Sequence, residues 1–99
     1  MSLKKVTVLA TIKAKKGLEE TVKNEIMSLL SPTRAEPGCL NYDLHQSCDD
    51  NAVFMLYENW VSKEDLDKHL AMPYLQAFLG KAPDLVAEPV QIALWEMLE

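Results

Sequence analysis

The stretch Val53-Phe-Met-Leu-Tyr-Glu-Asn-Trp60 is the strongest strand signal in this chain of 99 residues. It is rich in β-branched, aromatic and other apolar residues, and it contains neither glycine nor proline. Alternate side chains of a strand point to opposite faces. One face therefore carries Phe54, Leu56, Glu58 and Trp60, and the other carries Val53, Met55, Tyr57 and Asn59. Because both faces are largely apolar, we expect both to be covered in the folded protein.

On both sides of this stretch, the hydrophobic pattern switches between strand and helix periods. Further strand patterns cover residues 4–14, 39–47 and 88–98. A helical stripe covers residues 18–31, with a restart at Pro32 and an end near residue 35. Ser62 is expected to cap a short helix. Another helix begins at Pro73 and should end at Gly80, because Pro83 opposes its continuation.

The order strand, helix, strand, strand, helix, strand is the ferredoxin-like βαββαβ pattern of α+β proteins. Its two right-handed crossovers predict one antiparallel sheet in the order 4-1-3-2. The length of the chain favours a single domain over residues 1–99. The helices can cover only one face, which leaves Met55, Tyr57, Trp95 and Met97 in water. An apolar patch of this kind indicates an interface, so we expect a homodimer in which two open sheet faces meet.

The composition excludes several classes of function. The net charge of -5 and the pI near 5 argue against partners such as nucleic acids and anionic membranes. No apolar run approaches the roughly 18 residues that a membrane span needs, and no signal peptide is expected, so we predict a cytoplasmic protein.

The cysteine and histidine content indicates neither a disulfide nor a metal site. If Cys39 and Cys48 share a strand, they stand roughly 30 Å apart, whereas a disulfide needs Cα atoms within about 7 Å. We therefore expect both to be free thiols. Two cysteines and two histidines at these separations do not make a zinc motif, and we predict no metal site.

Glu58 is the first candidate for chemistry, because its neighbours on the strand face, Leu56 and Trp60, are apolar. A buried carboxylate must be paired, hydrogen-bonded or neutral. It could serve as a general base or bind the substrate. The alternative is a structural glutamate at the end of a strand, bonded to a helix or to a partner chain.

The two histidines are the other candidate acid-base groups. His69 lies between two leucines of the short helix, where it could accept a proton near neutral pH or could be a core-edge residue bonded to the backbone. His45 shares a strand face with Asn41 and Asp43, so it is either an acid-base group at a pocket rim or a polar interface residue.

Aromatic and apolar residues between sheet and helices could line a flat cavity for a small molecule. Their alternative role is core packing. The candidate lining residues are Trp60, Tyr74, Phe78, Leu56 and Tyr42.

Several motifs resemble one family, the antibiotic biosynthesis monooxygenase (ABM) domain. They are the run from Glu36 to Ser47 (EPGCLNYDLHQS), the run from Phe54 to Trp60, the pair His69-Leu70, and the pair Pro73-Tyr74. The resemblance covers essentially the whole chain and is strongest to the small bacterial quinol monooxygenase-like branch.

This resemblance implies a dimeric ferredoxin-like α+β barrel. It also implies oxidation of a quinol or a polycyclic phenol by O2 without a cofactor, with a small aromatic substrate bound in an apolar pocket. Trp60 matches the family's pocket tryptophan, and Glu58 and His69 occupy positions that we assign to the pocket.

Two alternative functions remain at this stage. The first is a small-molecule-binding dimer without catalysis. The second is an isomerase of a small phosphorylated metabolite, similar to the relatives that act on phosphorylated autoinducer-2. A phosphate site favours inward Arg or Lys, and the inward faces carry none. Haem-degrading relatives resemble the chain less, since Ala10 and Phe78 stand where those proteins have Asn and His.

Overall fold

Four antiparallel strands form one sheet, whose alternating pattern of apolar residues was the main signal in the sequence. The computed structural model describes residues 4–99, and residues 1–3, which the domain prediction included, lie outside the described part. The strands are β1 (Val6–Lys13), β2 (Cys39–Gln46), β3 (Val53–Trp60) and β4 (Gln91–Trp95). Their spatial order is β2-β3-β1-β4, which is the predicted order 4-1-3-2 read from the opposite edge. The ferredoxin-like prediction is therefore confirmed.

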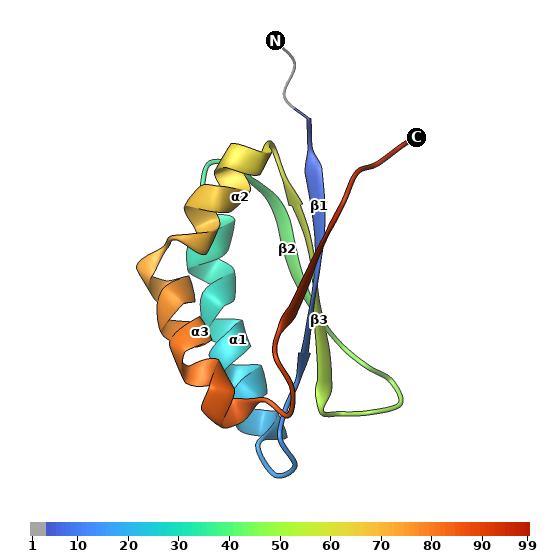
Figure 1. Ribbon diagram of the computed structural model, residues 1–99, viewed down its shortest axis with the longest axis vertical. Helices are drawn as coiled ribbons and strands as arrows, with labels where there is room; N and C mark the ends of the chain where they lie inside the picture. Colours follow the sequence, from blue (N-terminus) through green and yellow to red (C-terminus); the bar gives the residue numbers. More distant parts are fainter. Residues whose placement is uncertain (1–3) are drawn as a thin grey trace.

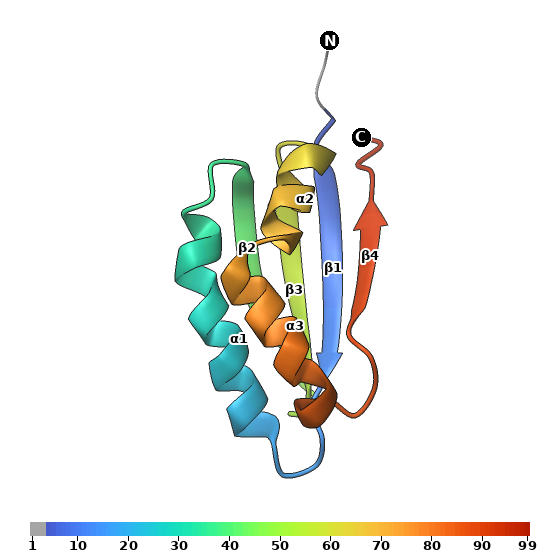
Figure 2. The ribbon, with the colours of Figure 1, turned by 60° about the vertical axis from the view of Figure 1, so that its left-hand side comes forward.

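Three helices cover one face of this sheet and leave the other face bare (Figure 1). They are α1 (Glu19–Arg34), α2 (Lys63–Leu70) and α3 (Pro73–Leu85). The view in Figure 2 shows α1 beside the β2 edge and α3 in front of β3, while β4 stands at the far edge with no helix in front of it. None of the helices within residues 4–99 is both long and apolar enough to cross a membrane.

The helix starts follow local signals, and α1 ends at Arg34, close to the predicted residue 35; the restart predicted at Pro32 and the α3 end predicted at Gly80 are wrong. Ser62 caps α2 by accepting a hydrogen bond from the Asp65 backbone N–H at 3.2 Å. However, α1 continues through Pro32 to Arg34 without a restart, and α3 continues through Gly80 and Pro83 to Leu85. In α3 the buried stripe extends past the glycine to Ala82. Packing of this stripe outweighs a glycine penalty of about 1 kcal/mol.

Two strand predictions also need correction. Strict alternation along the predicted strand 39–47 would put Leu40 on the same inward face as Tyr42, but Leu40 is 55% exposed, because the pairing of β2 with β3 shifts register between Cys39 and Asn41. The last strand is shorter than predicted. Its inward residues Ile92 and Leu94 stay 42% and 45% exposed, because the helices do not reach β4.

The register of the sheet arranges the inward side chains in rows across the strands. One row contains Tyr42, Glu58, Val8 and Leu94, in the order β2-β3-β1-β4. The next row along the sheet contains Leu44, Leu56, Ala10 and Ile92. A tyrosine and a carboxyl therefore lie side by side at one level, and the level beside them is entirely apolar.

Candidate functional site

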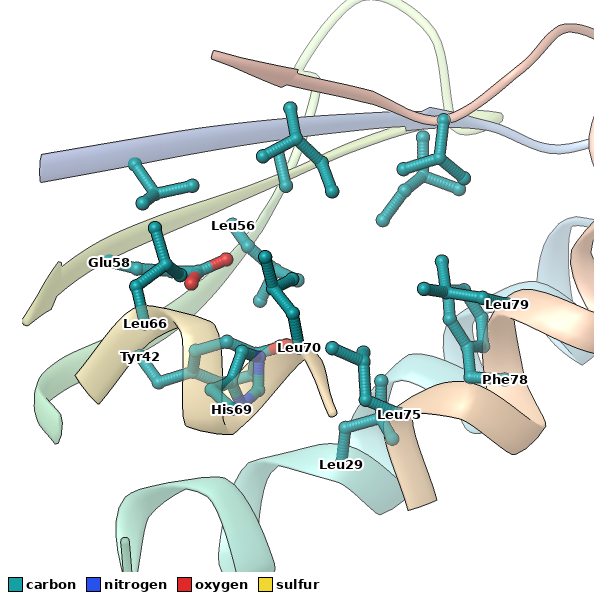
Figure 3. Close-up of a pocket in the computed structure, with 15 residues that line it drawn as sticks. Leu29, Tyr42, Leu56, Glu58, Leu66, His69, Leu70, Leu75, Phe78 and Leu79 are labelled. Atoms are coloured by element: carbon teal, nitrogen blue, oxygen red, sulfur yellow. The ribbon is translucent and has the colours of Figure 1, made fainter. Parts of the chain in front are cut away.

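A narrow slot lies between the sheet and the helices, and most side chains of the two rows just described line its sheet side (Figure 3). The row around Ala10 leaves space over β1, because alanine carries only a methyl group. The slot is lined by Val8, Ala10, Ile12, Leu29, Tyr42, Leu56, Glu58, Leu66, His69, Leu70, Leu75, Phe78, Leu79, Val90 and Ile92.

The polar groups of the slot gather at one end. Figure 3 shows Tyr42, Glu58 and His69 together beside α2, whereas Leu75, Phe78 and Leu79 lie toward the other end. None of the described lining residues is Lys or Arg. The slot therefore suits a neutral molecule with one hydroxyl-bearing end and an apolar remainder.

The carboxyl of Glu58 is buried, with a relative exposure of 4%. Its Oε1 accepts a hydrogen bond from the Trp60 indole Nε1–H at 2.9 Å. Burial raises the pKa of Glu58 to about 7; the Trp60 hydrogen bond works against this shift, and the charge of Glu36 adds to it. A carboxyl with this pKa can take up and release a proton near neutral pH.

His69 is buried at the same end of the slot as Glu58, and it is held by a second carboxyl, that of Glu36. Its Nδ1 lies 2.8 Å from Oε2 of Glu36, and its ring packs against the Trp60 ring at a centroid distance of 4.6 Å. The Tyr74 hydroxyl donates a hydrogen bond to the same Oε2 atom. We assign the donor role in this contact to the Nδ1–H of His69, because a carboxylate oxygen accepts, and Nε2 is then the ring nitrogen left for another partner.

Glu36 is the site residue that the sequence reasoning missed, since a glutamate before a Pro-Gly turn is ordinarily exposed. Here it is only 8% exposed, because its turn packs against the start of α2. A Cβ on Gly38 would lie 2.2 Å from Cγ of Asp65, so the close approach requires glycine. The Val61 N–H also donates to the Gly38 carbonyl at 2.9 Å. The available signal was that the family-like motif begins at Glu36.

The other candidate residues fall into two groups. Tyr42, Leu56 and Phe78 line the slot, as does the Glu58–His69 pair. Trp60 is fully buried behind Glu58 rather than lining the slot, and Tyr74 is half-buried with its hydroxyl on Glu36. Both support the polar groups instead of forming the cavity wall that we expected.

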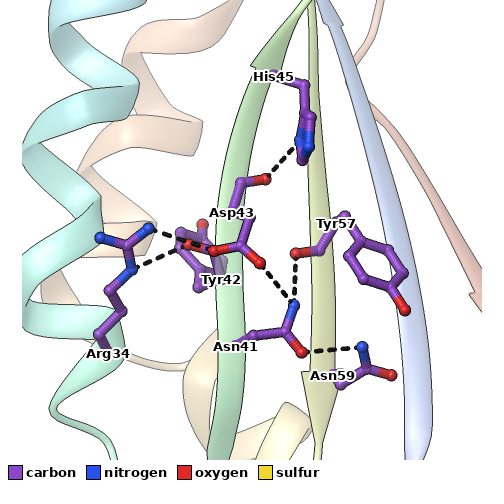
Figure 4. Close-up of polar contacts among 7 residues, drawn as sticks. All are labelled: Arg34, Asn41, Tyr42, Asp43, His45, Tyr57 and Asn59. Atoms are coloured by element: carbon purple, nitrogen blue, oxygen red, sulfur yellow. Dashed lines mark hydrogen bonds and ion pairs between the residues drawn. The ribbon is translucent and has the colours of Figure 1, made fainter.

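His45 lies apart from the slot, on the open face of the sheet (Figure 4). It is exposed, and its Nδ1 faces the backbone oxygen of Asp43 at 3.1 Å. The structure therefore does not bring His45 together with Glu58 and His69.

The open face carries its own chain of hydrogen bonds across three strands, and Figure 4 shows the part of it that lies on β2 and β3. Thr7 Oγ1 donates to Asn59 Oδ1 at 2.6 Å, and Asn59 Nδ2 donates to Asn41 Oδ1 at 2.9 Å. Asn41 Nδ2 continues the chain to Asp43 Oδ2 at 3.1 Å, and Arg34 reaches the other oxygen of that carboxylate at 3.4 Å. The polar side chains of this face thus satisfy one another.

The free space in the slot is smaller than a flat aromatic guest needs. It amounts to about 30 Å³, whereas a single water requires roughly 10–15 Å³ by this measure. The slot therefore has room for one or two waters, and lining side chains must move before an aromatic ring can enter.

Comparisons with known proteins agree with this architecture. The sequence model of the family described as "Antibiotic biosynthesis monooxygenase" matches residues 5–81. The Synechocystis "Uncharacterized protein sll1783" is 31% identical over 94 residues, which cover 95% of this chain and 64% of that protein. The chain thus spans less than two thirds of the length of that relative.

Two solved structures are similar over nearly their whole length. The crystal structure of PA3566 from Pseudomonas aeruginosa has a TM-score of 0.93 and 32% sequence identity, and the match covers 100% of this chain and 99% of that chain. The structure of Rv0793 from Mycobacterium tuberculosis has a TM-score of 0.91 at 27% identity, covering 96% of both chains. That protein carries the name "Putative monooxygenase Rv0793".

Proposed function

Because the chain belongs to the antibiotic biosynthesis monooxygenase family, we propose that it is a cofactor-independent monooxygenase of a quinol or a polycyclic phenol. The observation that carries the proposal is the pairing of two proton-accepting groups, Glu58 and His69, at one end of an apolar slot. A phenolic hydroxyl at this end meets a carboxyl whose pKa of about 7 matches the task of a general base.

The chemistry needs a base and a dry pocket. Removing the phenolic proton gives an electron-rich anion, which passes one electron to O2. The resulting radical and superoxide combine into a peroxide on the ring carbon, and loss of water leaves a carbonyl there. For a hydroquinone, one molecule of substrate and one of O2 give one hydroxybenzoquinone and one water. One oxygen atom enters the product, and the other leaves as water.

The residues around the slot divide this work. Glu58 takes the phenolic proton, and Nε2 of His69 supplies the second hydrogen-bonding position beside it. Trp60 fixes the carboxyl of Glu58, and Glu36 fixes the tautomer of His69. The surrounding apolar side chains exclude water, which strengthens each of these electrostatic contacts.

We further propose a homodimer formed through the open sheet face. Trp95 and Tyr57 on this face are 56% and 40% exposed, and they flank the polar chain built on Asn41 and Asn59. Exposed aromatic residues beside satisfied polar groups are typical of protein interfaces. A second copy would cover these rings with its own.

An isomerase of a phosphorylated metabolite fits the slot less well. A buried phosphate needs cationic or multiple backbone N–H partners, and the described lining has no Lys or Arg. The one carboxyl in the described lining, that of Glu58, would repel a phosphate when it is ionised.

The test is oxygen uptake by metal-free protein with a panel of hydroquinones and polycyclic phenols, followed with an oxygen electrode. We expect turnover in the wild type and a loss of about 10²–10⁴-fold in kcat for Glu58→Gln. Glu64→Gln is the matched control, because Glu64 is exposed on α2 away from the slot. Should Glu58→Gln and His69→Ala both leave turnover unchanged, the assignment of the base is wrong. Binding of these phenols without oxygen uptake would point instead to a non-catalytic binding protein.

A further inference from the structure

A second hollow adjoins the slot at the end opposite its polar groups. It lies between the C-terminal part of α3 and the segment that leads into β4, and it measures about 470 Å³, far more than the 30 Å³ of the slot. Its lining residues are Leu79, Ala82, Pro83, Val86, Ala87, Glu88, Pro89 and Val90.

The hollow and the slot share two wall residues. Leu79 and Val90 line both spaces, and both side chains are half-buried rather than locked in the core. Leu79 comes from α3, whereas Val90 stands just before the first residue of β4. A rotation of these two side chains would join the spaces into one, running from the hydroxyl-binding end to the surface.

The chemistry of the hollow restricts what can occupy it. Among its eight described lining residues, Glu88 alone is charged and is exposed, and the other seven are apolar. A volume of several hundred Å³ is in the range of ligand sites, whereas the slot alone is not. The occupant is therefore a neutral hydrocarbon group, connected through Leu79 and Val90 to a head in the slot.

We propose that this hollow is a subsite for a hydrocarbon side chain carried by the phenolic substrate, with Leu79 and Val90 as the gate between head and tail. The phenolic head rests on the proposed function, whereas the tail subsite rests on the hollow and its shared walls. The preferred substrate is therefore an alkylated phenol or quinol rather than an unsubstituted one.

The experiment is a binding series under anaerobic conditions, so that no turnover occurs. Isothermal titration calorimetry with methyl-, propyl-, pentyl- and heptylhydroquinone measures Kd for each. Complete burial of a methylene tightens binding by about four-fold. We expect the affinity to rise by nearly four-fold per methylene through the first members of the series. It should then reach a plateau once the hollow is full.

Two variants distinguish binding in this subsite from non-specific hydrophobic binding to the protein surface. Ala87→Trp fills the hollow and should flatten the series, and Ala87→Leu should give an intermediate slope. The exposed Ala77 of α3 lines neither space, so Ala77→Trp adds the same bulk elsewhere and should keep the wild-type slope. Circular dichroism checks that each variant is folded.

A flat series in the wild type overturns the subsite, as does an equal slope in wild type and Ala87→Trp. Oxygen uptake distinguishes this outcome from failure of the oxygenase proposal. If the affinity rises with alkyl chain length but no oxygen is consumed, the subsite is supported and the oxygenase proposal is contradicted. If oxygen is consumed but the affinity does not depend on chain length, the oxygenase proposal is supported and the subsite is contradicted.

Discussion

Glu58 and Asn59 are neighbours on β3 and are almost equally buried, with relative exposures of 4% and 5%, yet they lie on opposite faces of the sheet. Glu58 lies under the helices among apolar side chains, where one indole N–H is its partner. Asn59 lies on the face without helices and is hydrogen-bonded on both sides, to Thr7 and to Asn41. One strand thus presents a poised acid on one face and a satisfied amide on the other.

The two residues are buried in different ways, one by the helices and the other by neighbouring polar side chains. On the covered face, helices remove water from a group that keeps few partners, so its protonation equilibrium shifts. On the open face, polar side chains bury one another, and the apolar rings beside them remain in water. Both proposals rest on this contrast: a chemical site within one chain on the covered face, and an interface with a second chain on the open face.

The largest effect should come from the pH dependence of stability at Glu58. Its pKa is raised from 4.5 to about 7, so the folded chain binds this proton more readily than the unfolded chain. The stabilisation is therefore fully present below pH 4.5 and is lost as the pH rises through 7. Glu58→Gln lacks this titration. As the pH rises from 4 to 8, the free energy of unfolding of the wild type should therefore fall by about 3 kcal/mol relative to that of Glu58→Gln.

Urea denaturation at pH 4 and pH 8, at one protein concentration, measures this difference. Glu64→Gln, an exposed acid-to-amide change, should show almost none of it. If the gap between wild type and Glu58→Gln is the same at both pH values, the carboxyl is not held in the protonated form by burial.

The next largest effect tests the open face. Trp95→Glu places a charge where we expect the partner's sheet, and it should weaken the dimer by at least about 2 kcal/mol, or roughly thirty-fold in Kd. Analytical ultracentrifugation across a concentration series reads this out. Ala77→Glu on the helical side is the control and should leave the dimer intact. A wild type that sediments as a monomer throughout would contradict the proposed interface.

The sequence predicted the parts of this fold that have a local signature. Alternation identified the strands, and Ser62 and Pro73 marked the starts of α2 and α3. The shifted register that exposes Leu40 has no such signature, because it depends on how β2 aligns with β3. Likewise, the passage of α3 through Gly80 is decided by packing against the rest of the chain.

The site was predictable to the extent that it follows from the period of one strand. Placing Glu58 among apolar neighbours needed only alternation along β3. Glu36 needed the tertiary fold, since it meets His69 across 33 residues of sequence. The position of Trp60 behind Glu58 rather than in the slot wall could not be predicted either. Periodicity assigns a residue to one face of the sheet, but it does not say whether its side chain reaches the cavity.

The smallest effect concerns the amide pair of the open face. Removing either Asn41 or Asn59 leaves the other amide without its partner at 2.9 Å, whereas removing both leaves no such orphan in the pair. In a cycle of Asn41→Ala, Asn59→Ala and the double variant, we therefore expect a coupling of about 1 kcal/mol in the free energy of unfolding. Urea titrations at fixed protein concentration supply the four values. Strictly additive losses would show that the two amides are buried independently, and the open face would then lose its distinction as a set of side chains that satisfy one another.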